Sequence, residues 1–459
     1  MELIYKKESA YLRTPEKTES AFAFAKDYMA FLDAAKTERE AAKTAIELAK
    51  AHGYRPYRLG DPIHAGDKLY LCNREKSVYF LKIGSEPLER GVYITAAHID
   101  SPRIDLKQQP LYEADGMAFF KTHYYGGLRK YQWVTIPLAL HGVIIKADGT
   151  RVELSIGERE DDPVFYINDL LPHLAAAQSK EPLSTAIKGE ELNILCGSMP
   201  TEDEEESDKI KLNVLKLLNE RCGVTEADFA SAELSLVPAT RARDVGFDRA
   251  LIASYGHDDR VCAYPALRAL LDCGEDNPHT QMCVLADKEE IGSMGVSGMQ
   301  CQLFTDIMDE IAENLGANPR VVRGNSICLS ADVTAAFDPN FASVFEKRNS
   351  AILGCGVAMS KFTGARGKSG TSDASAETVG RIRRLFDAAN VVWQTAELGK
   401  VDEGGGGTVA QYIANRNIDT LDVGVPVISM HAPVEVVSKV DVYSAYEAFA
   451  ALAKEAETK

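Results

Sequence analysis

The chain has 459 residues, 45% of them hydrophobic and 26% charged, so it is long enough for two domains with substantial cores. Its formal net charge of −17 at pH 7 argues against nucleic-acid binding, which requires clustered Lys and Arg side chains. No apolar segment approaches the ~20 residues of a membrane-spanning helix, and the Cys residues form no CxxC pair, so we expect no membrane association and a cytoplasmic protein with reduced thiols.

The N-terminal part of the chain predicts helices followed by strands. Residues 19–54 are rich in Ala, Glu and Lys and lack Pro, and their aromatic residues recur at partly helical spacing. This pattern predicts one or two amphipathic helices that end near Gly53. Between residues 59 and 98, the apolar runs KLYLC, SVYFLKIG and GVYITAAH alternate with turn residues and predict strands.

The pattern changes between about residues 106 and 237. The runs MAFFKTHYY, YQWVTIPLALHGVII and RVELSIG predict antiparallel or mixed β structure, and the acidic run at residues 202–208 predicts a solvated loop. From residue 238 onward, strands and helices alternate again. We therefore predict an α/β domain, formed by residues 1–105 and 238–459, whose sequence is interrupted by a smaller β-rich domain at residues 106–237.

Four strand-like apolar runs each lead into residues that can bind metals. The runs are GVYITAA, QMCVLA, SICLSA and DVGVPVISM, and the residues that follow them are His98 and Asp100, Asp287 with Glu289 and Glu290, Asp332, and His431. Because ligands collect beyond the carboxyl ends of the strands in an open α/β sheet, these side chains could converge on one site. Two His residues and several carboxylates suit a pair of divalent cations.

Each candidate also has an ordinary structural interpretation. His98 could bind a metal while Asp100 accepts its other ring N–H, or both could be loop residues. Asp258, which precedes a helical pattern, could bridge two cations or cap the helix. Of the adjacent Glu289 and Glu290, one could bind metal while the other acts as a general base, or both could be exposed acids. The joint pattern, rather than any single residue, indicates a metal site.

The motifs AAHIDSPRIDLK, GHDDR, DKEEIGS, SADVTAAFDPN and ISMHAPVEVV occur in this order along the chain. Together they closely resemble the family-18 metallo-aminopeptidases, the family of aspartyl aminopeptidase and vacuolar aminopeptidase I, over residues 96–446. The resemblance implies a zinc-peptidase-like catalytic domain with a mixed β-sheet flanked by helices, interrupted by a dimerisation domain. It also implies a homo-oligomer, with a dodecamer built from dimers as the expected form.

The resemblance assigns roles to seven residues. Five are metal ligands, with His98 and Asp332 on one zinc ion, Glu290 and His431 on the other, and Asp258 bridging the two. The remaining two are Asp100, which orients His98, and Glu289, the general base. One motif departs from the family, because relatives with acidic specificity often carry SADMAHAVHPN where this chain has SADVTAAFDPN. Asp338 thus replaces a His, and an acidic substrate preference does not transfer directly.

We therefore expect a metal-dependent aminopeptidase that removes the N-terminal residue of peptides with a free amino terminus. Two divalent cations, expected to be Zn²⁺, would acidify a water and polarise the scissile carbonyl, while Glu289 takes the water's proton. The same ligands also accept Co²⁺ or Mn²⁺. Two alternatives remain open: a related two-metal carboxypeptidase or amide deacylase, and a non-catalytic oligomeric binding protein.

Three segments are candidates for the substrate pocket. In DEGGGGTVAQYIA, the backbone N–H groups of Gly407 and Thr408 could meet a substrate before a helical pattern begins, unless the glycines only form a flexible turn. The resemblance suggests that Lys361 contacts substrate and that His173 reaches the active site of a neighbouring subunit. A solvated basic loop and a structural His are the respective alternatives. The preferred N-terminal residue, acidic or neutral apolar, stays open.

Overall fold

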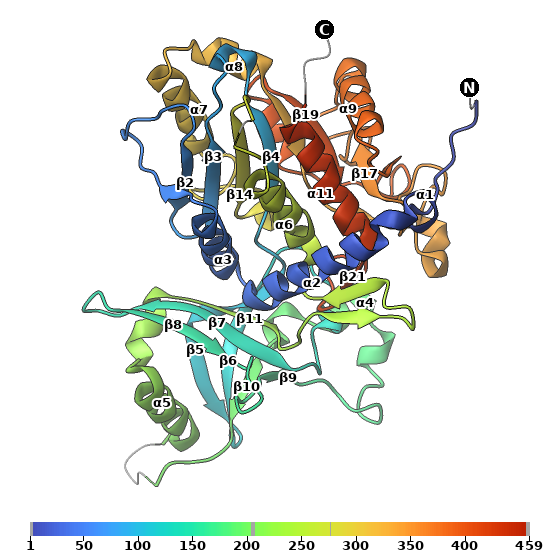
Figure 1. Ribbon diagram of the computed structural model, residues 1–459. Helices are drawn as coiled ribbons and strands as arrows, with labels where there is room; N and C mark the ends of the chain where they lie inside the picture. Colours follow the sequence, from blue (N-terminus) through green and yellow to red (C-terminus); the bar gives the residue numbers. More distant parts are fainter. Residues whose placement is uncertain (1–2, 203–206, 276, 456–459) are drawn as a thin grey trace. The chain divides into compact units, whose positions relative to one another are not determined.

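The computed structural model describes residues 3–202, 207–275 and 277–455, which form two compact units (Figure 1). The first unit comprises Met1–Ser101, Ala242–Met430 and Glu435–Lys459, and the second comprises Pro102–Arg241 and His431–Val434. Most of the acidic run at residues 202–208, predicted to be a loop, lies outside the described residues. Among the described helices, none combines the length and apolar composition needed to span a membrane.

A mixed sheet of nine described strands forms the centre of the first unit. Strands β14, β4, β15 and β19 run parallel to one another, while β3 and β17 join them in the antiparallel direction. The order across the sheet is β1 (Arg55–Pro56), β2 (Lys68–Asn73), β3 (Ser77–Lys82), β14 (Gln281–Ala286), β4 (Tyr93–His98), β15 (Ile327–Ser330), β19 (Asp419–Gly424), β17 (Val357–Ser360) and β18 (Trp393–Thr395). Strand β14 is apolar from Met282 to Ala286 and buried throughout, which is typical of a strand covered on both faces.

Helices cover both faces of this sheet, because residues of β2, β3, β14, β4 and β15 that point to opposite faces enter different hydrophobic clusters. Helices α6 and α11 cross one face, where α2, α3 and α9 contribute to the same cluster, and α7, α8 and α10 contribute to the other cluster (Figure 1). Their bounds are α2 (Thr18–Ala34), α3 (Glu38–Ala51), α6 (His257–Leu271), α7 (Leu303–Asn314), α8 (Pro319–Asn325), α9 (Ala376–Ala388), α10 (Ala410–Ala414) and α11 (Lys439–Ala453); a short α1 (Ala10–Arg13) precedes them. The prediction of one or two helices ending near Gly53 is confirmed, since two form, α2 and α3, and a capping box between Thr37 and Glu40 starts the second.

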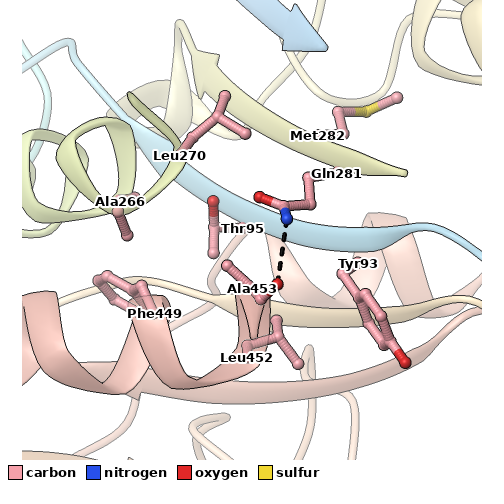
Figure 2. A pocket seen from close by; sticks show the side chains of 10 residues that line it. Tyr93, Thr95, Ala266, Leu270, Gln281, Met282, Phe449, Leu452 and Ala453 are labelled. Atoms are coloured by element: carbon pink, nitrogen blue, oxygen red, sulfur yellow. Dashed lines mark hydrogen bonds between the residues drawn. The ribbon is translucent and has the colours of Figure 1, made fainter. Parts of the chain in front are cut away.

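The interface between α6, α11 and the sheet is closely packed. It contains a cavity of about 10 Å³, lined by residues that include Thr95, Leu270, Gln281 and Phe449 (Figure 2). The side-chain amide of Gln281 donates a hydrogen bond to the backbone carbonyl of Ala453 across this cavity (3.1 Å) (Figure 2). A space of this size holds about one water molecule at most, so it belongs to the core and not to a substrate site.

A second sheet in the first unit corrects one prediction. Its five described strands are β12 (Arg243–Val245), β13 (Leu251–Ser254), β21 (Glu435–Ser438), β20 (Pro426–Ile428) and β16 (Thr334–Ala335). The run DVGVPVISM, which we predicted as one strand-like run, is divided between β19 and β20, and the chain changes sheets between Gly424 and Pro426. His431 therefore does not follow a strand of the central sheet, and that part of the prediction is wrong.

The second unit is built on an antiparallel sheet of seven described strands, which confirms the predicted β structure of the middle segment. The strands, in spatial order, are β8 (Arg151–Ile156), β7 (Leu138–Ile145), β11 (Ala232–Pro238), β5 (Arg103–Ala114), β6 (Met117–Tyr125), β10 (Ile194–Gly197) and β9 (Tyr166–Ile167), and the helices are α4 (Leu183–Ala186) and α5 (Lys209–Cys222). The nine Cys residues, all in the described part of the chain, are free thiols in this structure.

Candidate metal centre

The parallel strands of the central sheet bring three of the predicted segments to one edge. His98 is the last residue of β4 and is in register with Ala286, the last residue of β14. On the other side of β4, Ala96 is in register with Ser330, which precedes Asp332 by two residues. The carboxyl ends of these strands therefore carry His98, the Glu289–Glu290 pair and Asp332 to neighbouring positions, as the sequence predicted.

His98 is the centre of this arrangement. It is 1% exposed, and its Nε2 lies 3.1 Å from Asp258 Oδ1, 3.9 Å from Glu289 Oε2 and 4.0 Å from Asp332 Oδ1. Its Nδ1 lies 3.0 Å from the backbone carbonyl of Asp100 and 3.3 Å from that residue's Oδ1. Because a carbonyl oxygen only accepts, Nδ1 is the donor, and Nε2 faces the carboxylates.

The charges around His98 control its protonation. Burial alone would lower its pKa, but hydrogen bonds and attraction from Asp100 and Asp258 outweigh burial and raise the pKa well above the usual range. Burial raises the pKa of Asp332 well above the usual range as well, with further contributions from the charges of Asp259 and Glu289. A cation among these side chains would relieve both effects, because it replaces the proton that each group otherwise holds.

Asp100 has two functions in this geometry. Its carboxylate is fully buried and accepts the backbone N–H of Glu289 at 3.1 Å through Oδ1 and that of Glu290 at 3.2 Å through Oδ2. It thereby fixes the start of the loop that carries both glutamates. His98, in contrast, has its shorter contact with the backbone carbonyl of Asp100. We predicted that the carboxylate of Asp100 orients His98, and in this geometry the backbone carbonyl of Asp100 contributes to that orientation as well.

Three groups of side chains among the described residues could each hold a metal ion, with ligand atoms within 4.8 Å of one another. They are His98 with Asp258 and Glu290, His98 with Glu289 and Asp332, and Asp258 with Asp259 and Asp332. Asp258 faces His98 with non-helical backbone angles, while Gly256 is the N-cap position of α6. This geometry favours the ligand interpretation of Asp258 over helix capping.

Asp259 is a member of the cluster that the sequence did not single out as a ligand candidate. It is completely buried, and its Oδ2 accepts the backbone N–H of His98 at 3.3 Å. Burial and repulsion from Asp258 raise its pKa well above the usual range. The neighbouring Arg260 is also buried, but its guanidinium donates to the backbone carbonyls of Lys36 and Ile99. The two adjacent acids before a helical pattern were a sequence signal for Asp259 as a ligand candidate, although helix capping explains the same pattern equally well.

His431 belongs to the second unit, where its Nδ1 donates to the backbone carbonyl of Gly127 at 2.6 Å. Because Nδ1 carries the proton in this bond, Nε2 is the unprotonated ring nitrogen, which is the tautomer a metal ligand requires. The three groups found among the described residues do not include His431. Its assignment as a ligand stays a prediction.

The candidate substrate-binding residues have varied surroundings. The hydroxyl of Thr408 is buried and donates to Asp422 Oδ1 at 2.9 Å, whereas Gly407 is exposed. Contact of their backbone N–H groups with a substrate stays a prediction. Lys361 forms an ion pair with Asp373, which also accepts from Lys368 at 2.8 Å. Its positive charge is therefore partly balanced.

Comparison with known proteins identifies the family. A family model described as aminopeptidase I zinc metalloprotease (M18) matches residues 31–452. The chain belongs to the M18 family. The probable M18 family aminopeptidase 1 of Clostridium acetobutylicum is 47% identical over 444 residues, covering 95% of both chains. The protein of the same name from Thermotoga maritima is 45% identical, covering 95% of this chain and 96% of the other.

Solved M18 structures have the same fold. The crystal structure of the M18 aminopeptidase from Thermotoga maritima matches with a TM-score of 0.94 at 42% identity, and that of aminopeptidase I from Clostridium acetobutylicum with 0.92 at 43%. Each match covers 99% of this chain and 100% of the other. The predicted family and mixed α/β fold are thus confirmed. The protein is an aminopeptidase of a zinc metalloprotease family, a hydrolase that depends on a metal cofactor, so the carboxypeptidase, deacylase and non-catalytic alternatives are set aside.

Proposed function

We propose that this M18 aminopeptidase hydrolyses the first peptide bond of its substrate with two divalent cations, expected to be zinc. His98 and Asp332 would hold one ion, Glu290 and His431 the other, and Asp258 would bridge them. The main support is the overlap of the metal-binding groups, because Asp258 shares one group with Glu290 and another with Asp332. A carboxylate that faces both sets of ligands is the residue a bridging role requires.

The donor set fits such cations. Buried carboxylates beside one another repel, and the raised pKa values of Asp259 and Asp332 are a consequence of burial and this repulsion. His nitrogen together with carboxylate oxygen is a ligand combination that zinc accepts. When bound, the cations would supply Lewis acidity, which polarises the scissile carbonyl and lowers the pKa of a water molecule towards ~7.

The residues of the chain would then perform the proton transfers. We assign Glu289 as the general base, which takes a proton from the attacking water and delivers it to the departing amine. Asp100 would hold Glu289 in position through the backbone N–H that it accepts at 3.1 Å. The negative charge of the cluster's carboxylates would attract the protonated amino terminus of a peptide, and this attraction would confine cleavage to the first residue.

The second unit would serve assembly. We propose that it is a dimerisation domain and that His173 contributes to the active site of a neighbouring subunit. His173 is exposed, and the neighbouring Leu170, Leu171 and Leu174 are 52%, 50% and 67% exposed, which is unusual unless a partner covers them. The S. cerevisiae mApe1 dodecamer has a related fold, with a TM-score of 0.77 at 20% identity. A dodecamer is accordingly the form we expect for this chain.

The decisive experiment replaces Glu289 by Gln, which keeps the size of the side chain but removes its basic oxygen. We expect kcat for an aminoacyl reporter peptide to fall by roughly 10²–10⁴-fold, while elemental analysis still finds two metal ions per chain. Glu313→Gln, at an exposed position of α7, is the matched control and should retain full activity. Retention of activity in Glu289→Gln would contradict the base assignment, and one ion per chain would contradict the binuclear centre.

A further inference from the structure

Helix α10 follows the glycine-rich segment and contacts the loop that carries Glu289 and Glu290. Before it, the glycine-rich segment ends at Thr408, whose hydroxyl is fixed on Asp422 of strand β19. Within and beside the helix, Val409 and Ile413 are fully buried in the same hydrophobic cluster as Phe304 of α7. The helix is therefore anchored at its start and along its apolar face, although it spans only Ala410–Ala414.

The polar side of α10 contacts the loop that carries Glu289 and Glu290, which we call the base loop and define as residues 287–301. The hydroxyl of Tyr412 donates to the backbone carbonyl of Gly292 at 3.4 Å. Gln300, a residue of the base loop itself, donates to the same carbonyl at 2.8 Å. Burial raises the pKa of Tyr412, and the next contribution is the charge of Glu289.

Arg416, two residues beyond α10, contacts the other end of the base loop. Its Nη2 donates to the backbone carbonyls of Met299 and Cys301, both at 3.1 Å, and its Nε donates to Thr305 Oγ1 at 3.0 Å. The guanidinium also donates to the backbone carbonyl of Tyr412. A planar guanidinium can contact several oxygens at fixed angles at once, which the ammonium group of a Lys cannot reproduce. Arg416 consequently ties the end of the base loop to α10.

The base loop needs such support because its backbone is irregular. Lys288, Gly292 and Ser293 all have positive φ angles, of 67°, 92° and 56°. Positive φ angles are unfavourable for side-chain-bearing residues and persist only where surrounding contacts impose them. Asp100 provides contacts at the start of the loop by accepting two backbone N–H groups. Comparable contacts at Gly292 and beyond come from Gln300, Tyr412 and Arg416.

We propose that Tyr412 and Arg416 are positioning residues for the general base, acting through the base loop that α10 holds in place. This inference rests on the proposed role of Glu289. A displacement of about 1 Å at a reacting group can cost roughly 10²-fold in rate, so a clamp on the backbone near Glu289 affects the chemical step more than substrate binding. Neither residue touches the reacting atoms in this assignment.

The test uses two substitutions of different severity in the full-length protein. Arg416→Lys keeps the positive charge but loses the planar set of donors, and Tyr412→Phe removes only the hydroxyl. We expect kcat to fall roughly tenfold in Arg416→Lys and about threefold in Tyr412→Phe, with KM changed less than about twofold. Arg381→Lys is the matched control, because Arg381 of α9 is also half-buried and forms a two-point contact with Glu455.

A second measurement does not depend on activity or on metal. Hydrogen exchange of the metal-free protein should show faster exchange of the amides of Gly292, Gln300 and Cys301, which are hydrogen-bonded within the loop, by at least roughly tenfold in Arg416→Lys. Exchange in the segment around Arg381 should stay as in the wild type. Because the two substitutions act on one loop, their effects on kcat should be less than additive in the double variant.

Three results would overturn the proposal: unchanged exchange of these amides in Arg416→Lys, an effect on KM without an effect on kcat, or an equal loss of kcat in Arg381→Lys. A failure of the proposed function is distinguishable from these. If Glu289→Gln retained activity while Arg416→Lys accelerated exchange of the base loop, α10 would still clamp the loop but the base would be another residue.

Discussion

Asp100 provides the sharpest test of how the site is held together. Its carboxylate accepts two backbone N–H groups, those of Glu289 and Glu290, while His98 Nδ1 has a shorter contact with the backbone carbonyl of the same residue. Replacing Asp100 by Asn leaves that carbonyl in place. It changes one carboxylate oxygen into an NH₂ group, which donates and cannot accept.

The size of the effect follows from these contacts. Whichever position the NH₂ group takes, the N–H of Glu289 or that of Glu290 loses its acceptor and faces another donor. A hydrogen bond to a charged group contributes about 1.5–3 kcal/mol, and each ~1.4 kcal/mol lost from transition-state stabilisation is a tenfold loss of rate. We therefore expect kcat to fall by roughly 10–100-fold. Zinc affinity will also decrease, because a negative charge beside the cluster is lost.

The assay separates these two effects. The rate of aminoacyl reporter hydrolysis is measured against zinc concentration, and kcat is read at saturating metal. We expect kcat of Asp100→Asn to remain low at saturation, whereas Asp387→Asn, a substitution on α9, should behave as the wild type. Complete recovery of kcat at saturating zinc would refute the reasoning, because Asp100 would then act only on metal affinity through His98.

Two further predictions concern protonation and packing. In the folded metal-free protein, Asp259, Asp332 and His98 have raised pKa values and hold protons that the unfolded chain releases above about pH 4 for the acids and about pH 6.5 for the imidazole. The Tm of the metal-free protein should therefore fall as pH rises from about 5 to about 8, and this fall should be shallower in Asp259→Asn. The increase in Tm on adding zinc should grow with pH, because zinc then displaces fewer protons. An increase in Tm on adding zinc that does not depend on pH would contradict this prediction. A Cβ atom at Gly424 would collide with the backbone carbonyl of Asp332, whereas one at Gly274 meets nothing within 4 Å. We therefore expect Gly424→Ala to lower the free energy of unfolding, measured with denaturant, by about 1–3 kcal/mol or more and to weaken zinc retention, whereas Gly274→Ala should behave as the wild type. Equal stability of the two variants would contradict this prediction.

The sequence predicted the core of the candidate site because strand ends can be recognised from composition. The runs that precede His98 and Asp287 are continuous apolar segments bounded by polar residues, and a parallel sheet places the ends of such strands at one edge. The run before His431 misled the prediction. A change of sheet at Gly424 depends on a close backbone approach to Asp332, and apolar periodicity contains no information about such an approach.

Other features could not be predicted because they depend on tertiary contacts between distant segments. Arg416 donates to the backbone carbonyls of Met299 and Cys301, which lie more than a hundred residues earlier in the sequence. The sequence around Arg416 does not indicate these acceptors. The ion pair between Lys361 and Asp373 could not be predicted either, because a basic loop sequence does not indicate which acid its lysine will contact. This ion pair lowers the net positive charge available to an acidic substrate side chain, and it thereby weakens the argument for acidic specificity.

The contacts of the base loop act on the candidate ligand Glu290 and the proposed base Glu289 together. Glu289 and Glu290 share one stretch of backbone, which Asp100 holds by two N–H groups and Tyr412 and Gln300 hold by the carbonyl of Gly292. A single rigid segment therefore sets both the position of a candidate ligand and that of a candidate base. Binding of a cation to Glu290 would restrict the same backbone further, so that metal loading and positioning of the base are mechanically coupled. On this reasoning, loss of the contacts at Gly292 reduces the rate even when every ligand is present.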